Sequence, residues 1–158
     1  MSKSTSKEEF IAHELKSNFG DVISELKVTG PRRVYVTVPP ESLRDILLFL
    51  KNMFNARHIV TITGIDMMKS FELIYHIAVP GEHIRSILVN VKTHIPRDNP
   101  TMPSVVDILP GATLYEREVH DLLGIVFEGH PNLERLILPD DWPEDEFPLR
   151  KDWKPKEV

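Results

Sequence analysis

The stretch of residues 33–54, RVYVTVPPESLRDILLFLKNMF, contains both periodicities from which the fold is built. In its first part Val34, Val36 and Val38 alternate with polar or larger side chains, which predicts a half-buried strand over residues 33–38. Two prolines then end the strand. Apolar side chains recur at helical spacing as far as Phe54, which predicts a helix over residues 41–54 with Asn55 as its C-cap.

Working outward from this stretch, we predict a first helix that begins at a capping box formed by Ser6 and Glu9 and ends at Gly20. A third helix is predicted to begin at a second capping box, Thr113 with Glu116, and to end at Gly124. Further strands are predicted over residues 22–28, 58–65, 71–79 and 84–94, with turns at Gly30-Pro31 and Pro80-Gly81. The sequence therefore predicts an α+β fold, with a mixed β-sheet covered by helices on one face.

The last part of the chain follows a different pattern. Residues 96–110 contain four prolines and form a predicted loop, and residues 126–158 combine prolines and acidic residues with large apolar side chains. We therefore predict an α+β domain over residues 1–125 and an extended C-terminal strap over residues 126–158. A tail this apolar either folds back on the domain or lies in a groove of another subunit.

Composition excludes several classes of function. The chain has 158 residues and a net charge of −5, so it has no general attraction to nucleic acid or anionic membranes. It has no cysteine, which excludes disulfides, thiolate nucleophiles and Cys-ligated iron–sulfur clusters. Neither a signal peptide nor a transmembrane helix is expected, so we expect a cytosolic or peripheral chain. The absence of Cys and Gln favours a thermophilic source.

Two alternatives remain open for the charged residues of the third predicted helix and the strap. Glu116, Glu118, His120, Asp121 and His130 have the chemistry of metal ligands and would suit a metal-dependent hydrolase. Their simpler role is in surface pairs four residues apart, Glu116 with His120 and Arg117 with Asp121. The arginines of the strap suit either partner carboxylates or ion pairs within the chain.

The same region carries a long ordered motif. Its residues are Glu116-Arg117-Glu118, Asp121-Leu122, Gly124-Ile125, Phe127, Gly129-His130-Pro131, Leu133, Arg135, Leu138-Pro139, Asp141-Trp142 and Pro148-Leu149-Arg150-Lys151-Asp152. This motif resembles that of the thirty-kilodalton subunit of respiratory complex I, the NADH–quinone oxidoreductase, and of the related subunits of membrane-bound nickel–iron hydrogenases. The similarity extends upstream to Thr63-Gly64-Ile65-Asp66. The chain departs from the usual family residues at Leu114, His120, Leu123 and Trp153.

The resemblance implies a subunit without its own active site, cofactor or metal. It would brace the large catalytic subunit of a complex I-like membrane-bound redox complex of the hydrogenase, NADH or F420H2 dehydrogenase type. Iron–sulfur clusters and nickel–iron would then belong to partner subunits, and the chain would lie peripherally on the cytoplasmic side of the membrane. A free-standing metal-dependent hydrolase and a small adaptor domain are the alternatives. The residues expected to bind partners are Glu116, Arg117, Glu118, Asp121, His130, Pro131, Arg135, Trp142, Leu149, Arg150, Lys151, Asp152 and Trp153.

Overall fold

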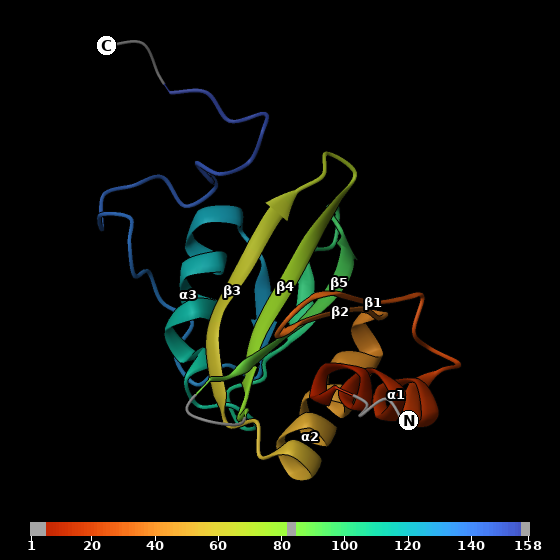
Figure 1. The fold of residues 1–158 in the computed structure, drawn as a ribbon. Coiled ribbons are helices and arrows are strands. Elements are labelled where there is room, and N and C mark those ends of the chain that lie inside the picture. The colour runs from red at the N-terminus through yellow and green to blue at the C-terminus, as the bar shows by residue number, and fades with distance from the viewer. Residues whose placement is uncertain (1–5, 82–84, 156–158) are drawn as a thin grey trace, which may run out of the picture.

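In the part of the chain that the structure describes, the fold is a five-stranded mixed sheet with three helices and a separate two-stranded sheet (Figure 1). The computed structural model describes residues 6–81 and 85–155. In these ranges no helix is both long and apolar enough to cross a lipid bilayer. The elements are α1 (Lys7–Phe19), β1 (Glu25–Gly30), β2 (Arg33–Thr37), a 3-10 turn (Pro40–Ser42), α2 (Leu43–Phe54), β3 (His58–Asp66), β4 (Ser70–Val79), β5 (Ile87–Pro96), β6 (Thr101–Pro103), α3 (Ala112–Leu123) and β7 (Val126–Glu128).

The large sheet has the strand order β1-β2-β5-β4-β3, so β1 and β3 are its edges. Only β2 and β5 run parallel, while the other neighbours are antiparallel. One face carries the buried rows of the core, for example Val36, Val91, Tyr75 and Ile62, which lie opposite one another across four strands. The helices cover this face, which confirms the predicted α+β class.

The alternation in β2 and the apolar stripe of α2 produce the predicted burial. Val34 and Val36 are fully buried, and so are Leu43, Ile46 and Leu50 of α2. The predicted capping box of α1 is present, because Ser6 and Glu9 exchange hydrogen bonds. Asn55 ends α2 in the left-handed conformation, as expected for a C-cap.

One predicted strand start is wrong for a local reason, and two other predictions involve residues outside the described ranges. The strand predicted from Val22 begins instead at Glu25, because the amides of Val22 and Ile23 bond to the carbonyl of Phe19 in the turn that ends α1. The strand predicted from Ile84 begins at Ile87 among the described residues, and Ile84 itself lies outside them. The turn predicted at Pro80-Gly81 borders residues 82–84, which lie outside the described residues.

The predicted loop and the start of the predicted strap contain a pairing that the sequence patterns did not indicate. β6 pairs in parallel with β7, and Met102 and Phe127 on these strands are buried in the common core. The common core therefore includes β7, at the start of the predicted strap. From here on, "the strap" means residues 129–155.

The third helix is present, but its predicted start is wrong. α3 begins at Ala112 after Gly111, without a side-chain cap. Thr113 lies inside the first turn, where its hydroxyl donates to the carbonyl of Pro110. The predicted end at Gly124 is confirmed, with φ of 74° in the left-handed region that glycine adopts without strain.

Candidate functional site

The strap folds back along α3 and then loops out beyond the end of the sheet (Figure 1). Its first anchor is His130. The Nδ1 atom of His130 accepts a hydrogen bond from the amide of Asn132 at 3.0 Å, so its proton lies on Nε2. Nε2 then donates to the carbonyl of Thr113 at 3.0 Å, at the beginning of α3.

The second anchor is made by two side chains from successive turns of α3. Arg117 donates from Nε to the carbonyl of Glu134 at 3.0 Å and from Nη2 to the carbonyl of Arg135 at 2.6 Å. One turn later, Oδ2 of Asp121 accepts three backbone amides of the strap at 3.2, 2.8 and 2.8 Å, from Leu136, Ile137 and Leu138. Successive amides that converge on one anion in this way form a backbone nest.

The protonation state of Asp121 follows from these contacts. Burial by itself would raise the pKa of this carboxyl, whose residue is only 5% exposed. The three strap amides outweigh burial and lower the pKa of Asp121 below its usual value. The group is therefore an anion at neutral pH, and its charge strengthens the bonds that hold the strap.

The third anchor lies at the end of α3. The amide of Leu149 donates to the carbonyl of Leu122 at 3.1 Å, and Nε of Arg150 donates to the carbonyl of Leu123 at 2.8 Å. The guanidinium of Arg150 also lies over the ring of Phe147, 4.4 Å from its centroid. Arg150 thus satisfies a helix-end carbonyl while it stacks on an aromatic ring of the strap.

A fourth anchor joins the strap to the end of β3. Oδ2 of Asp66 accepts the amide of Lys151 at 2.9 Å and Nη2 of Arg97 at 3.1 Å. The same Nη2 bonds to Oδ1 of Asp152 at 2.7 Å. Burial acts to raise the pKa of Asp66, but the amides of Lys151 and Met68, together with the charge of Arg97, lower it overall.

Sequence reasoning did not assign Asp66 and Arg97 to the site. A signal for Asp66 was available, since it is the last residue of the quoted Thr63-Gly64-Ile65-Asp66 element. Arg97 had no such signal. It reaches Asp152 only because the ends of β3 and β5 lie beside the returning strap.

The outer loop of the strap is closed by its two tryptophans. The rings of Trp142 and Trp153 lie 5.8 Å apart with an angle of 34° between them. Both indole N–H groups donate to Glu146, one to its carbonyl at 2.9 Å and one to its carboxylate at 3.2 Å. The half-buried tryptophans therefore stabilise the loop of the strap itself.

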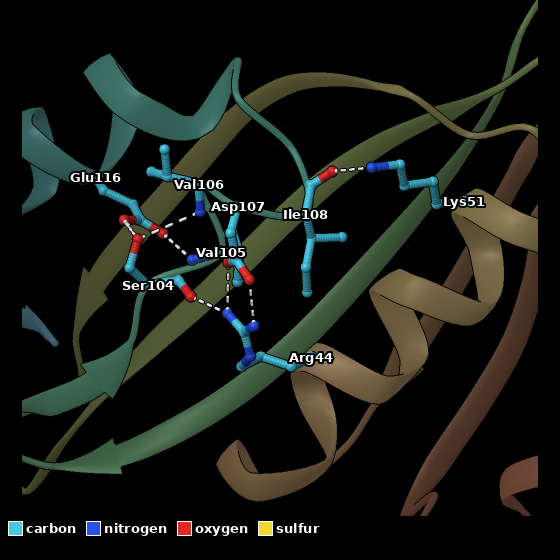
Figure 2. A network of polar contacts seen from close by, with 8 residues as sticks. All are labelled: Arg44, Lys51, Ser104, Val105, Val106, Asp107, Ile108 and Glu116. Atoms are coloured by element: carbon cyan, nitrogen blue, oxygen red, sulfur yellow. Dashed lines mark hydrogen bonds and ion pairs between the residues drawn. The ribbon is translucent and has the colours of Figure 1, made fainter. Parts of the chain in front are cut away.

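Glu116 has a different role from the other motif residues. It is fully buried, and its carboxylate accepts the hydroxyl of Ser104 at 2.6 Å and the amide of Val105 at 2.8 Å (Figure 2). The network continues from this loop to α2, where Arg44 contacts the carbonyl of Ser104 and binds Asp107 through two bonds of 2.8 and 2.6 Å. Figure 2 shows this network joining α3, the loop and α2.

The environment of Glu116 raises its pKa. Burial is the main cause, and the hydrogen bonds from Ser104 and Val105 offset it only in part. Glu116 is thus buried and bonded within the chain, where it joins α3 to the loop of Ser104 and Val105.

The structure does not bring the proposed metal ligands together. Glu116 points to Ser104, Asp121 to the strap amides, and Nδ1 of His120 to the carbonyl of Ile125 at 2.7 Å. Among residues 6–81 and 85–155 no group of three or more His, Asp or Glu side chains is placed to hold a metal ion. The predicted pairs of Glu116 with His120 and Arg117 with Asp121 are wrong, because each of these side chains has another partner.

Some apolar side chains of the strap are exposed, although others, such as Leu133, pack against the core. Ile137 and Leu149 are 54% and 55% exposed, and Leu136 is also exposed. Leu114, near the start of α3, is also exposed. Pro131 and the side chain of Lys151 lie on the surface too, while Glu118 and Arg135 are half-buried.

Comparisons with known proteins found relatives over most of the chain. The family model described as respiratory-chain NADH dehydrogenase, 30 Kd subunit, matches residues 36–158. A subunit of the F(420)H(2) dehydrogenase of Methanosarcina mazei is 35% identical over 146 residues, which cover 91% of this chain and 90% of that protein. The beta subunit of the membrane-bound hydrogenase of Pyrococcus furiosus is 31% identical over 151 residues, which cover 94% of this chain and 87% of that protein.

A solved structure is similar over nearly the same length. A chain in the structure of the membrane-bound sulfane sulfur reductase, an archaeal respiratory membrane complex, is 34% identical with a TM-score of 0.82. The match covers 94% of this chain and 86% of that chain. On the family model, the relatives and the shared fold, this chain belongs to the family of the 30 kDa subunit of respiratory-chain NADH dehydrogenase.

Proposed function

We propose that this chain is a cofactor-free subunit of a membrane-bound redox complex and that its strap docks against the large catalytic subunit. The observation that carries the proposal is the orientation of the strap. Polar motif residues such as Arg117, Asp121 and Arg150 hold it against the domain, while Leu136, Ile137 and Leu149 face outward. Exposed, prearranged apolar side chains are typical of an interface.

The remaining roles follow from the relatives. Their names are those of subunits of dehydrogenases, hydrogenases and respiratory complexes. We propose that iron–sulfur and nickel–iron or quinone chemistry belongs to partner subunits, and that this chain braces them peripherally on the cytoplasmic side. The contacts are proposed for the exposed and half-buried residues Glu118, Pro131, Arg135, Trp142, Leu149, Lys151 and Trp153. The hydrolase alternative is not favoured, because its candidate ligands are dispersed.

The test is purification of the tagged full-length chain from its host in mild detergent, followed by subunit identification and metal analysis. The wild-type chain should be recovered with a large catalytic subunit and iron–sulfur proteins. Nickel together with iron would indicate a hydrogenase-type complex, and iron without nickel a quinone-, F420H2- or sulfur-linked relative. Recovery of the chain alone would contradict the proposal.

A matched pair of variants tests the strap itself. Ile137→Asp places a charge at the centre of the proposed interface, and recovery of the large subunit should fall on the order of tenfold or more. Leu48→Asp makes the same kind of change at an exposed leucine of α2, away from the strap, and should leave recovery unchanged. Equal recovery with both variants would show that the strap is not the docking surface.

A further inference from the structure

The two edges of the large sheet are protected differently. β1 is a six-residue strand that carries the charged side chains of Glu25 and Lys27. β3 is a nine-residue edge strand, HIVTITGID, with no lysine, arginine or proline and a single irregularity near Val60. Natural proteins usually protect exposed edges with charges, prolines or short strands. A long and weakly protected edge therefore indicates a surface that another chain covers.

The register shows which backbone groups of β3 point outward. The amide of Met67 bonds to the carbonyl of Ser70 at 2.8 Å across the β3–β4 turn. Because hydrogen-bonded and non-bonded pairs alternate in an antiparallel ladder, Thr63 faces β4 while Ile62 and Gly64 direct their N–H and C=O groups outward. In the part of the chain that the structure describes, no other segment forms a backbone hydrogen bond with this edge.

A groove of about 240 Å³ runs beside these groups, and we call it the β3 groove. At Gly64 the strand and α3 are in close contact. A Cβ atom added to Gly64 would lie 2.5 Å from Cδ1 of Leu123, so only glycine allows α3 to pack directly on β3 here. Leu149 of the strap lines the same groove, which makes it continuous with the proposed docking surface. The lining residues are Thr61, Ile62, Thr63, Gly64, Glu118, Val119, Leu122, Leu123 and Leu149.

Glu118 places a charge in the wall of this groove. Its side chain is half-buried, and among the described residues no hydrogen bond or ion pair reaches its carboxylate. A partly buried carboxylate is stabilised by a cation, and arginine or lysine is the usual partner. β3 contains no arginine or lysine. If a second copy of this chain paired with β3 through its own β3 strand, that strand would therefore supply no such partner for Glu118.

We propose that an extended segment of the large partner subunit adds a strand to β3 in the β3 groove and places an arginine or lysine against Glu118. The inference rests on the proposed function, since it identifies how the partner is held. The added strand would bond to two outward donors and two outward acceptors, those of Ile62 and Gly64. Its alternate side chains would face Leu122 and Leu149 on the α3 side of the groove.

Amide hydrogen exchange with residue-level resolution tests the proposal on the full chain alone and in the purified complex. In the isolated chain the amides of Ile62 and Gly64 should exchange faster than those of Thr63 and Ile65, which bond to β4. In the complex, exchange at Ile62 and Gly64 should slow on the order of tenfold or more. A complex that forms while both amides remain fast would overturn the strand addition and leave the proposed function intact.

Two charge-reversal variants test the cation. Glu118→Lys should lower recovery of the partner and restore fast exchange at Ile62 and Gly64. Glu14→Lys reverses a half-buried glutamate on α1 and should change neither measurement. Unchanged protection in Glu118→Lys would overturn the contact with a cation.

Two further outcomes would count against the proposal. Slow exchange of Ile62 and Gly64 in a concentrated solution of the isolated chain, accompanied by dimers, would assign the edge to a second copy. Recovery of the chain without any partner would overturn both the inference and the function on which it rests.

Discussion

Asp121→Ala removes the carboxylate on which three strap amides converge. Hydrogen bonds to charged groups contribute about 1.5–3 kcal/mol each. The three bonds share one oxygen atom, two of them at 2.8 Å and one at 3.2 Å, and water replaces them when the strap separates from α3. The combined loss is therefore closer to that of one or two such bonds, about 2–4 kcal/mol.

This loss should appear as local opening of the strap rather than as unfolding of the sheet. The amides of Ile137 and Leu138 should exchange roughly 30- to 700-fold faster in Asp121→Ala, since each 1.4 kcal/mol is a factor of ten. Asp121→Asn keeps an acceptor oxygen but no charge, and should cost about 1–2 kcal/mol. Asp140→Ala is the matched control, because Asp140 lies exposed on the strap.

The pH dependence gives a second measurement on the same group. The pKa of Asp121 is lower in the folded chain than its usual value, so its stabilisation is complete above the usual aspartate range. It should be lost as the pH falls through the lowered pKa, and Asp121→Asn should lack this loss. Exchange at Ile137 and Leu138 that is identical in wild type and Asp121→Ala would refute the assignment of Asp121 as the anchor of the strap.

Two further predictions concern the remaining anchors. Burial raises the pKa of Glu116, so wild-type stability should fall as the pH rises from the usual glutamate range to the raised pKa, which is the opposite of the pH dependence expected from Asp121. Glu116→Gln should remove this fall. Urea titrations of both proteins at several pH values would show the difference. A variant that keeps the wild-type pH dependence would contradict this. Arg150→Lys keeps the charge but loses the planar group that lies over Phe147. The exchange rate of the Leu149 amide should rise by an amount equivalent to about 0.5–2 kcal/mol. An unchanged rate would show that the stacking does not contribute.

Much of the fold could be predicted because its signals are local. The alternation of Val34 and Val36, the apolar stripe of α2 and the glycine after α3 each act within a few residues, and each was confirmed. β6 and β7 were missed because each is only three residues long and depends on the other for its pairing. Val22 was misassigned because its amide was needed in the turn after α1.

The motif in the last third of the chain identified the family, but the patterns did not show how each motif residue is used. Glu116 has the spacing of a capping-box residue, yet it is buried against Ser104. Arg117 and Asp121 are spaced for a surface pair, yet both bind the backbone of the strap. Spacing along a helix shows which side chains are neighbours, but it does not show what packs against them.

The sequence by itself determined the α+β class, the main helices and strands, and membership of the 30 kDa subunit family, because periodicity, caps and an ordered motif are properties of neighbouring residues. Only the tertiary structure decided that Asp66 meets the amide of Lys151, that Glu116 is buried, and that β3 is a weakly protected edge. Each of these depends on the order of strands in the sheet and on the path of the strap. They are set by packing between segments that lie far apart in the chain.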